Sequence, residues 1–97
     1  MERWQERTAV LLGEETLDAL ASKRVMVVGL GGVGAYAAEM LCRAGVGNMV
    51  LIDSDTVGES NLNRQLIALN STVGKLKTDV LAERLKDIIL GTGNKTV

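Results

Sequence analysis

The sequence predicts an α/β fold in which two parallel strands and the helix between them form a βαβ unit, preceded by short helices. Residues 25–28 (VMVV) and 48–52 (NMVLI) are apolar runs of strand length. A glycine-rich turn follows the first run, and a helical pattern of apolar residues separates the two. This order requires a parallel pair joined by a right-handed crossover. A continuous apolar run is typical of a strand covered on both faces, and we expect this of the first strand.

Composition excludes several classes of protein. The 97 residues include eleven Lys plus Arg, twelve Asp plus Glu and no His, for a formal net charge of −1. Near neutrality disfavours generic nucleic-acid binding, which needs a basic field. No segment approaches the roughly 20 apolar residues of a membrane span, and the N-terminus has no apolar signal-peptide core, so we expect a cytoplasmic protein without a membrane partner. With one cysteine, Cys42, and no His, we expect neither a disulfide nor a metal site in this chain.

Residues 1–22 are predicted to form a helical lead-in. A first helix covers residues 2–12 and includes Trp4, Val10 and Leu11, and Gly13 ends it. A second helix covers residues 14–21, with Leu17 and Leu20 on one side.

Residues 23–97 are predicted to form a βαβ-α core. The crossover helix is expected to bury Val33, Ala37, Leu41 and Ala44, and to pair Glu39 with Arg43 on its outer face. Residues 54–70 are polar and irregular, with a helical turn near residues 65–69. Ser71 or Thr72 is expected to cap a last helix over residues 73–89. The buried stripe of that helix is predicted to be Val73, Leu76, Val80, Leu85 and Ile88.

Residues 94–97 can only begin a third strand. A parallel sheet of two or three strands has open edges. Ordering costs roughly 1.5 kcal/mol per residue, so a chain this short gains much from a partner or from further sequence. We therefore expect part of a larger domain, or an oligomer.

The glycine-rich turn fits G-x-G-x-x-G in the context that this motif requires, after a strand and at the start of a helix. In this motif Gly29 allows a tight turn, Gly31 lets the backbone approach a phosphate, and Gly34 allows helix and strand to pack closely. Backbone N–H groups of the turn, that of Gly32 included, and the helix dipole can then bind an anion. Asp53, 19 residues after Gly34 at the tip of the next strand, is placed to accept ribose hydroxyls. The turn and Asp53 together predict a Rossmann-like nucleotide site, and a purely structural glycine turn is the alternative.

Further polar residues follow the second strand. Asp55 is either a second nucleotide ligand or a turn-forming residue, since Asp is common in turns. An NAD-binding oxidoreductase would need only the turn and Asp53, but this chain continues with NLNRQ over residues 61–65 and VGKLK over residues 73–77.

The segments GVGNMVLIDSDTVGESNLNRQ and TVGKLK resemble the ubiquitin-activating-enzyme-like adenylating proteins. The resemblance covers about residues 3–88. Residues 7–14 and 31–39 look most like the tRNA threonylcarbamoyladenosine dehydratase branch. The resemblance implies activation of a carboxylate by adenylation, with ATP and Mg²⁺ as cofactors and the metal ligand outside this chain. It also implies a homodimer, and tRNA as a substrate bound through regions that this chain lacks.

The resemblance also assigns roles to single residues. Asp53 would bind the ATP ribose, Asn61 and Arg64 the phosphates, and Lys77 the α-phosphate region. Attack by a carboxylate on the α-phosphate adds negative charge to phosphate oxygens, which fixed cations stabilise. Arg64 and Lys77 are therefore the expected catalytic residues, one a bidentate fork and the other a point charge. Arg3 or Arg7 is the candidate for an N-terminal arginine that reaches the partner subunit's ATP.

Other interpretations remain open. Asn61, Asn63 and Gln65 could only satisfy loop backbone groups, and Arg64 could be a surface charge. An NAD-binding oxidoreductase domain would give no use to Arg64 or Lys77. A non-catalytic dimerisation module could keep the fold without the chemistry. Cys42 is expected to be a packed residue rather than a nucleophile.

Overall fold

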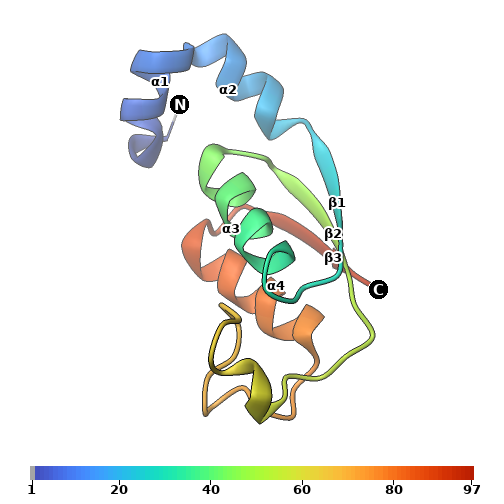
Figure 1. Ribbon diagram of the computed structural model, residues 1–97. Coiled ribbons are helices and arrows are strands. Elements are labelled where there is room, and N and C mark those ends of the chain that lie inside the picture. The colour runs from blue at the N-terminus through green and yellow to red at the C-terminus, as the bar shows by residue number, and fades with distance from the viewer. Residues whose placement is uncertain (1) are drawn as a thin grey trace.

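Three parallel strands form the centre of the protein, whose computed structural model describes residues 2–97 (Figure 1). They are β1 (Arg24–Val28), β2 (Asn48–Ile52) and β3 (Gly93–Thr96), in the order β1-β2-β3. The register pairs Val28 with Ile52 and Met49 with Asn94. The predicted βαβ unit is confirmed, and the third strand begins one residue earlier than the sequence indicated.

Helices α3 (Gly34–Ala44) and α4 (Lys77–Ile88) both lie on one face of this sheet (Figure 1). Two successive right-handed crossovers that proceed in the same direction place their helices on the same side. Residues of the core come from the strands and from both helices: Val27, Met49, Leu51, Ala35, Ala38, Cys42, Leu81 and Leu85. Within residues 2–97, none of the helices has the length and apolar character needed to cross a bilayer.

The opposite face of β1 is open. Met26 and Val28 point away from the helices and are 60% and 71% exposed. The expectation that the first strand is covered on both faces is therefore wrong for residues 2–97, because both crossover helices cover the same side. The burial of Cys42, expected from the sequence, is confirmed.

The lead-in extends beyond one end of the sheet (Figure 1). The predicted first helix is divided into a 3₁₀ turn, η1 (Arg3–Gln5), and helix α1 (Glu6–Leu12), and α2 (Glu14–Ala21) follows as predicted. Gly13, with φ of 84°, makes the corner between α1 and α2. Helix α1 buries none of its residues, and Val10 and Leu11 are exposed. Leu17 is the buried residue of α2, and Leu20 is the residue of α2 that packs, partly buried, against the core.

The buried face of α3 differs from the prediction. The helix buries Ala35, Ala38, Glu39 and Cys42, whereas Val33 is 83% exposed. Of the predicted set only Leu41 is partly buried. The difference is a rotation of the helix, which the close approach of Gly34 to the Gly29 carbonyl fixes.

The start of α4 is also a correction. The helix begins at Lys77 rather than residue 73, because Gly74 has a φ of 90° and makes a turn. The Thr72 hydroxyl does not cap α4, since it accepts a hydrogen bond from Leu69 N at 2.9 Å and donates one to Ile67 O at 2.7 Å. Leu76, predicted to be buried, is an exposed residue of extended backbone before the helix. The short helical turn expected near residues 65–69 is instead η2 (Glu59–Asn61).

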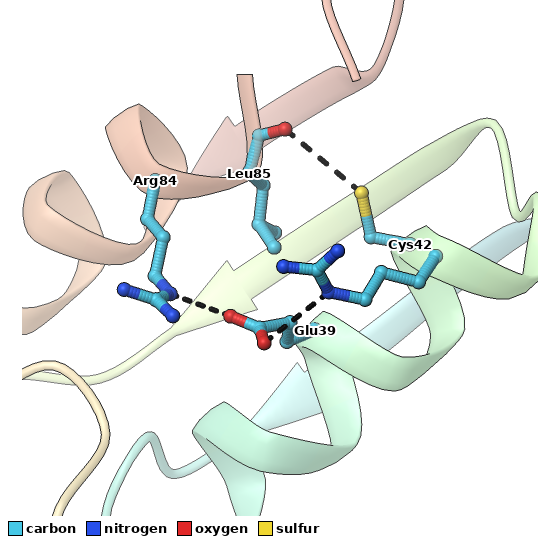
Figure 2. Close-up of polar contacts among 5 residues, drawn as sticks. Glu39, Cys42, Arg84 and Leu85 are labelled. Atoms are coloured by element: carbon cyan, nitrogen blue, oxygen red, sulfur yellow. Dashed lines mark hydrogen bonds and ion pairs between the residues drawn. The ribbon is translucent and has the colours of Figure 1, made fainter. Parts of the chain in front are cut away.

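Glu39 joins α3 to α4 (Figure 2). Its carboxylate accepts a hydrogen bond from Arg43 Nε at 3.3 Å and another from Arg84 Nε at 2.5 Å. The predicted pair with Arg43 is confirmed, but Glu39 is buried between the helices and not on the outer face. The pKa of Glu39 is lowered, mainly by the hydrogen bond from Arg84, although burial of the carboxylate acts in the opposite direction and raises it.

Candidate nucleotide-binding site

The glycine turn joins β1 to α3 at the carboxyl end of the sheet. Gly29 has a φ of 84°, a conformation that L side chains rarely adopt, and its N–H donates to Ile52 O at 2.8 Å. A Cβ at Gly34 would overlap the carbonyl oxygen of Gly29. A Cβ at Gly32 would meet nothing within 4 Å, and one at Gly31 would meet only the Gln65 side chain. The turn is therefore tight on its inner side and bare on its outer side, which leaves room for an anion.

Asp53, at the tip of β2, binds this turn directly. Its Oδ2 accepts a hydrogen bond from Leu30 N at 2.7 Å, and its Oδ1 accepts one from Asp55 N at 2.8 Å. Burial raises the pKa of Asp53, but these two hydrogen bonds and the charge of Lys77 outweigh it, so the pKa lies below its usual value. The carboxylate is ionised at neutral pH, and each oxygen keeps a second lone pair that can accept a ribose hydroxyl.

Lys77 reaches the same place from α4. Its backbone N–H donates to the carbonyl of Asp55 at 3.0 Å, which fixes the start of the helix beside the end of β2. The residue is only 6% exposed, and its positive charge acts on Asp53. Among residues 2–97 no carboxylate forms an ion pair with the Lys77 ammonium. A buried cation in the first turn of a helix opposes the helix dipole, so an anionic ligand here would relieve an unfavourable arrangement.

Asn61 and Arg64 lie in the loop between β2 and α4. Asn61 Oδ1 accepts a hydrogen bond from Gly58 N at 2.8 Å. The side-chain oxygen of Asn61 therefore satisfies a loop backbone group, which is the role that the sequence left open. The Arg64 guanidinium is exposed and donates to Ser60 O at 3.2 Å and to Asn63 Oδ1 at 2.9 Å. The structure thus brings together the glycine turn, Asp53, Asp55 and Lys77, whereas Asn61 and Arg64 bond within their own loop.

Gln65, for which the sequence left a loop-backbone role open, lies at the glycine turn. It is 8% exposed, and its Nε2 is 3.5 Å from the position of a Cβ at Gly31. The signal for it was weak, because a glutamine next to an arginine in a polar loop does not itself indicate burial.

A cavity of the protein lies elsewhere. It measures about 510 Å³, lies at the amino ends of the strands, and is lined by residues that include Trp4, Gln5, Gly45, Ile89 and Thr92. It contains none of the predicted site residues. Ligands of open α/β sheets bind outside the carboxyl ends of the strands, so we assign the candidate site to the glycine turn. Residues 2–97 hold no group of three or more His, Cys, Asp or Glu side chains that could bind a metal ion.

A glycine turn between strand and helix and an acidic residue at the tip of the next strand are the arrangement expected of a Rossmann-like nucleotide-binding site, and Lys77 lies close to it. Comparison with known proteins specifies its class. The model of the ThiF family matches residues 5–92. The chain therefore belongs to the ThiF family, and the resemblance to adenylating proteins is confirmed.

Individual relatives agree with this assignment. The tRNA threonylcarbamoyladenosine dehydratase of Bacillus subtilis (strain 168) is 49% identical over 82 residues, which are 84% of this chain and 32% of that protein. The protein of the same name from Escherichia coli (strain K12) is 48% identical over 88 residues, 88% of this chain and 33% of the relative. This chain thus spans about a third of the length of the curated relatives that it matches.

Solved structures show the same fold. The crystal structure of E. coli TcdA, a tRNA N6-threonylcarbamoyladenosine dehydratase, in complex with ATP matches with a TM-score of 0.93 and 43% identity, over 100% of this chain and 41% of that one. E. coli MccB with ATP matches with a TM-score of 0.80 and 31% identity, over 84% and 24% of the two chains.

Proposed function

We propose that this chain forms the ATP-binding part of an enzyme that activates a carboxylate by adenylation, of the tRNA threonylcarbamoyladenosine dehydratase type. The observation that carries the proposal is that Asp53, through Asp55, connects the glycine turn to the start of α4, where Lys77 is buried and forms no ion pair among residues 2–97. The similarity to TcdA solved in complex with ATP supports it.

In the proposed reaction a carboxylate oxygen attacks the α-phosphorus of ATP. The bond from that phosphorus to the bridging oxygen of the β-phosphate breaks, pyrophosphate leaves, and an acyl-adenylate forms. In the dehydratase type the carboxylate belongs to a threonylcarbamoyl group on adenosine, which then cyclises with loss of AMP.

The chain would contribute binding and charge stabilisation to this step. The glycine turn would offer the backbone N–H groups of Gly31 and Gly32 and the N-terminus of α3 to a phosphate, while Gly29 and Gly34 give the turn its shape. Asp53 would accept ribose hydroxyls. Lys77 would stabilise the negative charge that develops on the α-phosphate oxygens.

Asp55, Asn61 and Arg64 would complete the site. Arg64 would exchange its hydrogen bonds to Ser60 and Asn63 for a bidentate contact with a phosphate. Both of those hydrogen bonds are exposed to solvent, so breaking them costs little free energy. Mg²⁺ would enter with the triphosphate, whose oxygens are the hard ligands that it prefers, and its protein ligand would lie outside this chain.

The proposal includes a cytoplasmic homodimer. Helix α1 exposes Val10 and Leu11, an apolar surface that suits a second copy of the protein. Arg3 and Arg7, both exposed on the same lead-in, are the candidates to reach the partner subunit's ATP. A net charge of −1 gives the chain no general affinity for tRNA, so tRNA would bind through other regions.

Calorimetry with Mg-ATP and with NAD tests the nucleotide. We expect ATP to bind, and Arg64→Ala to weaken its binding. A preference for NAD that Arg64→Ala leaves unchanged would favour an oxidoreductase domain. In a form extended to the length of its relatives, good ATP binding without ATP–pyrophosphate exchange would instead favour a non-catalytic module.

A further inference from the structure

Gln65 is buried immediately beside Arg64, which is exposed. Its backbone N–H donates to Asn61 O at 2.9 Å, and its carbonyl accepts from Ala68 N at 3.1 Å, so both backbone groups are fixed within the loop. This backbone directs the side chain toward the glycine turn. Its Nε2 is the side-chain atom nearest to the outer side of Gly31, at 3.5 Å from the position a Cβ would take there.

The other carboxamide atom has an unusual environment. Oε1 is buried and has no hydrogen-bond partner among residues 2–97. An unpaired buried polar group costs about 1–3 kcal/mol, and such groups are rare in native proteins. A methionine of similar volume would fill the same space without this cost. Packing therefore does not explain a glutamine at this position.

We propose that Gln65 is a nucleotide-binding residue whose Nε2 donates a hydrogen bond to a phosphate oxygen held at Gly31. This inference rests on the proposed function and adds a residue to its site. Because Oε1 is withdrawn into the interior, the N–H₂ group is the part of the carboxamide that faces the turn. Gly31 is the glycine at which the motif lets a phosphate approach the backbone. Gln65 thus adds a neutral donor to a site whose other phosphate-binding side chains, Arg64 and Lys77, are cationic.

Two substitutions separate ligand binding from packing. Gln65→Met removes the donor and the unpaired oxygen while keeping the volume. We expect it to leave the midpoint of urea unfolding unchanged or higher and to weaken Mg-ATP binding about tenfold to a hundredfold, the worth of a hydrogen bond to a charged acceptor. Gln65→Glu places a carboxylate against the phosphate, so it should weaken binding further, and added salt should reduce that loss. Leu69→Met, an exposed change in the same loop, is the control and should alter neither quantity.

A measurement on the unsubstituted chain makes the test independent of how the variants fold. The Gln65 side-chain N–H₂ signals in the NMR spectrum should shift with Mg-ATP and with pyrophosphate, but not with adenosine. Absence of a shift with saturating Mg-ATP, or a Gln65→Met protein that binds ATP as the unsubstituted chain does, would overturn this inference and leave the proposed function intact. Failure of the unsubstituted chain to bind ATP would overturn both.

Discussion

Asp53 accepts a hydrogen bond from the backbone N–H of Leu30 at 2.7 Å, and this bond ties the tip of β2 to the glycine turn. The other carboxylate oxygen binds the N–H of Asp55, whose carbonyl in turn accepts from Lys77 N. The Asp53 side chain thus links the glycine turn to the end of β2, and the backbone of Asp55 links that end to the start of α4. The candidate site is therefore a consequence of how the strand ends are held.

Asp53→Asn should weaken both the fold and the site. An amide oxygen can accept from only one of the two backbone N–H groups, and the amide N–H₂ would face the other. We expect a loss of about 1–2 kcal/mol in the free energy of unfolding, measured with urea, since Asp53 is only partly buried. ATP affinity should fall about tenfold through the lost charge-assisted bonds. Asp18→Asn, on the exposed side of α2, should change neither, and equal effects of the two substitutions would contradict the account.

Acid should destabilise the protein. The pKa values of Asp53 and Glu39 are lowered from usual values of 3.8 and 4.5. At a pH just below those usual values, both groups therefore remain ionised in the folded chain, whereas the unfolded chain already binds protons. Their contribution is fully present above those usual values and is lost as pH falls below them through the lowered pKa values. Urea unfolding between pH 7 and pH 3 should show a decline below about pH 4.5 that is shallower in Glu39→Gln. An identical decline in that variant would contradict this assignment of Glu39.

Arg84 should matter more to stability than Arg43. Both bind Glu39, but Arg84 comes from the other helix, whereas Arg43 lies one turn away on α3 and its side chain is 52% exposed. We expect Arg84→Met to cost about 1–2 kcal/mol, because it loosens the contact between α3 and α4 and leaves a buried carboxylate with one partner. Arg43→Met should cost no more than about 0.5 kcal/mol, the usual value for an exposed pair. An equal loss of stability in Arg84→Met and Arg43→Met, measured by urea unfolding, would show that the bond between Glu39 and Arg84 does not stabilise the contact between α3 and α4.

Lys77→Met should reduce ATP affinity without reducing stability. The lysine is a buried cation at the start of α4, so its removal relieves a conflict with the helix dipole. ATP binding, followed by calorimetry, should weaken about tenfold to a hundredfold through loss of a charged contact. Lys75→Met, an exposed neighbour, provides the control and should bind ATP normally. A large loss of stability in Lys77→Met with unchanged affinity would mark Lys77 as a structural residue.

Gly34→Ala should damage the glycine turn. Its Cβ would overlap the Gly29 carbonyl oxygen, so α3 would have to move away from β1. We expect a loss of about 1–3 kcal/mol in thermal or urea unfolding, as for other overpacked sites. Gly91→Ala, where a Cβ would meet nothing within 4 Å, should be tolerated. A stable Gly34→Ala protein would mean that the close packing of turn and helix is not required.

The sequence predicted those parts of the fold that depend on local pattern. Apolar runs defined β1 and β2, and the glycines defined the turn, because both signals lie within a few residues. The start of α4 was missed because one of its determinants, the Asp55 carbonyl, is 22 residues away, and because a positive φ at Gly74 does not follow from the helical pattern. Burial of Glu39 was missed for the same reason, since its second partner, Arg84, is 45 residues away.

The candidate site was predictable to a similar extent. Gly29, Gly34 and Asp53 have the geometry that the motif requires, and Lys77 lies beside them. The proximity of Gln65 to Gly31 depends on the path of the loop between β2 and α4, which no periodic pattern records. Whether Arg64 leaves its loop for a phosphate depends on the ligand itself.

A titration of isotope-labelled protein with Mg-ATP, followed through the backbone amide signals, would locate the bound nucleotide. We expect the largest shifts at Leu30, Gly31, Gly32 and Lys77. Shifts centred instead on Trp4 and Thr92, which line the cavity at the amino ends of the strands, would contradict this expectation.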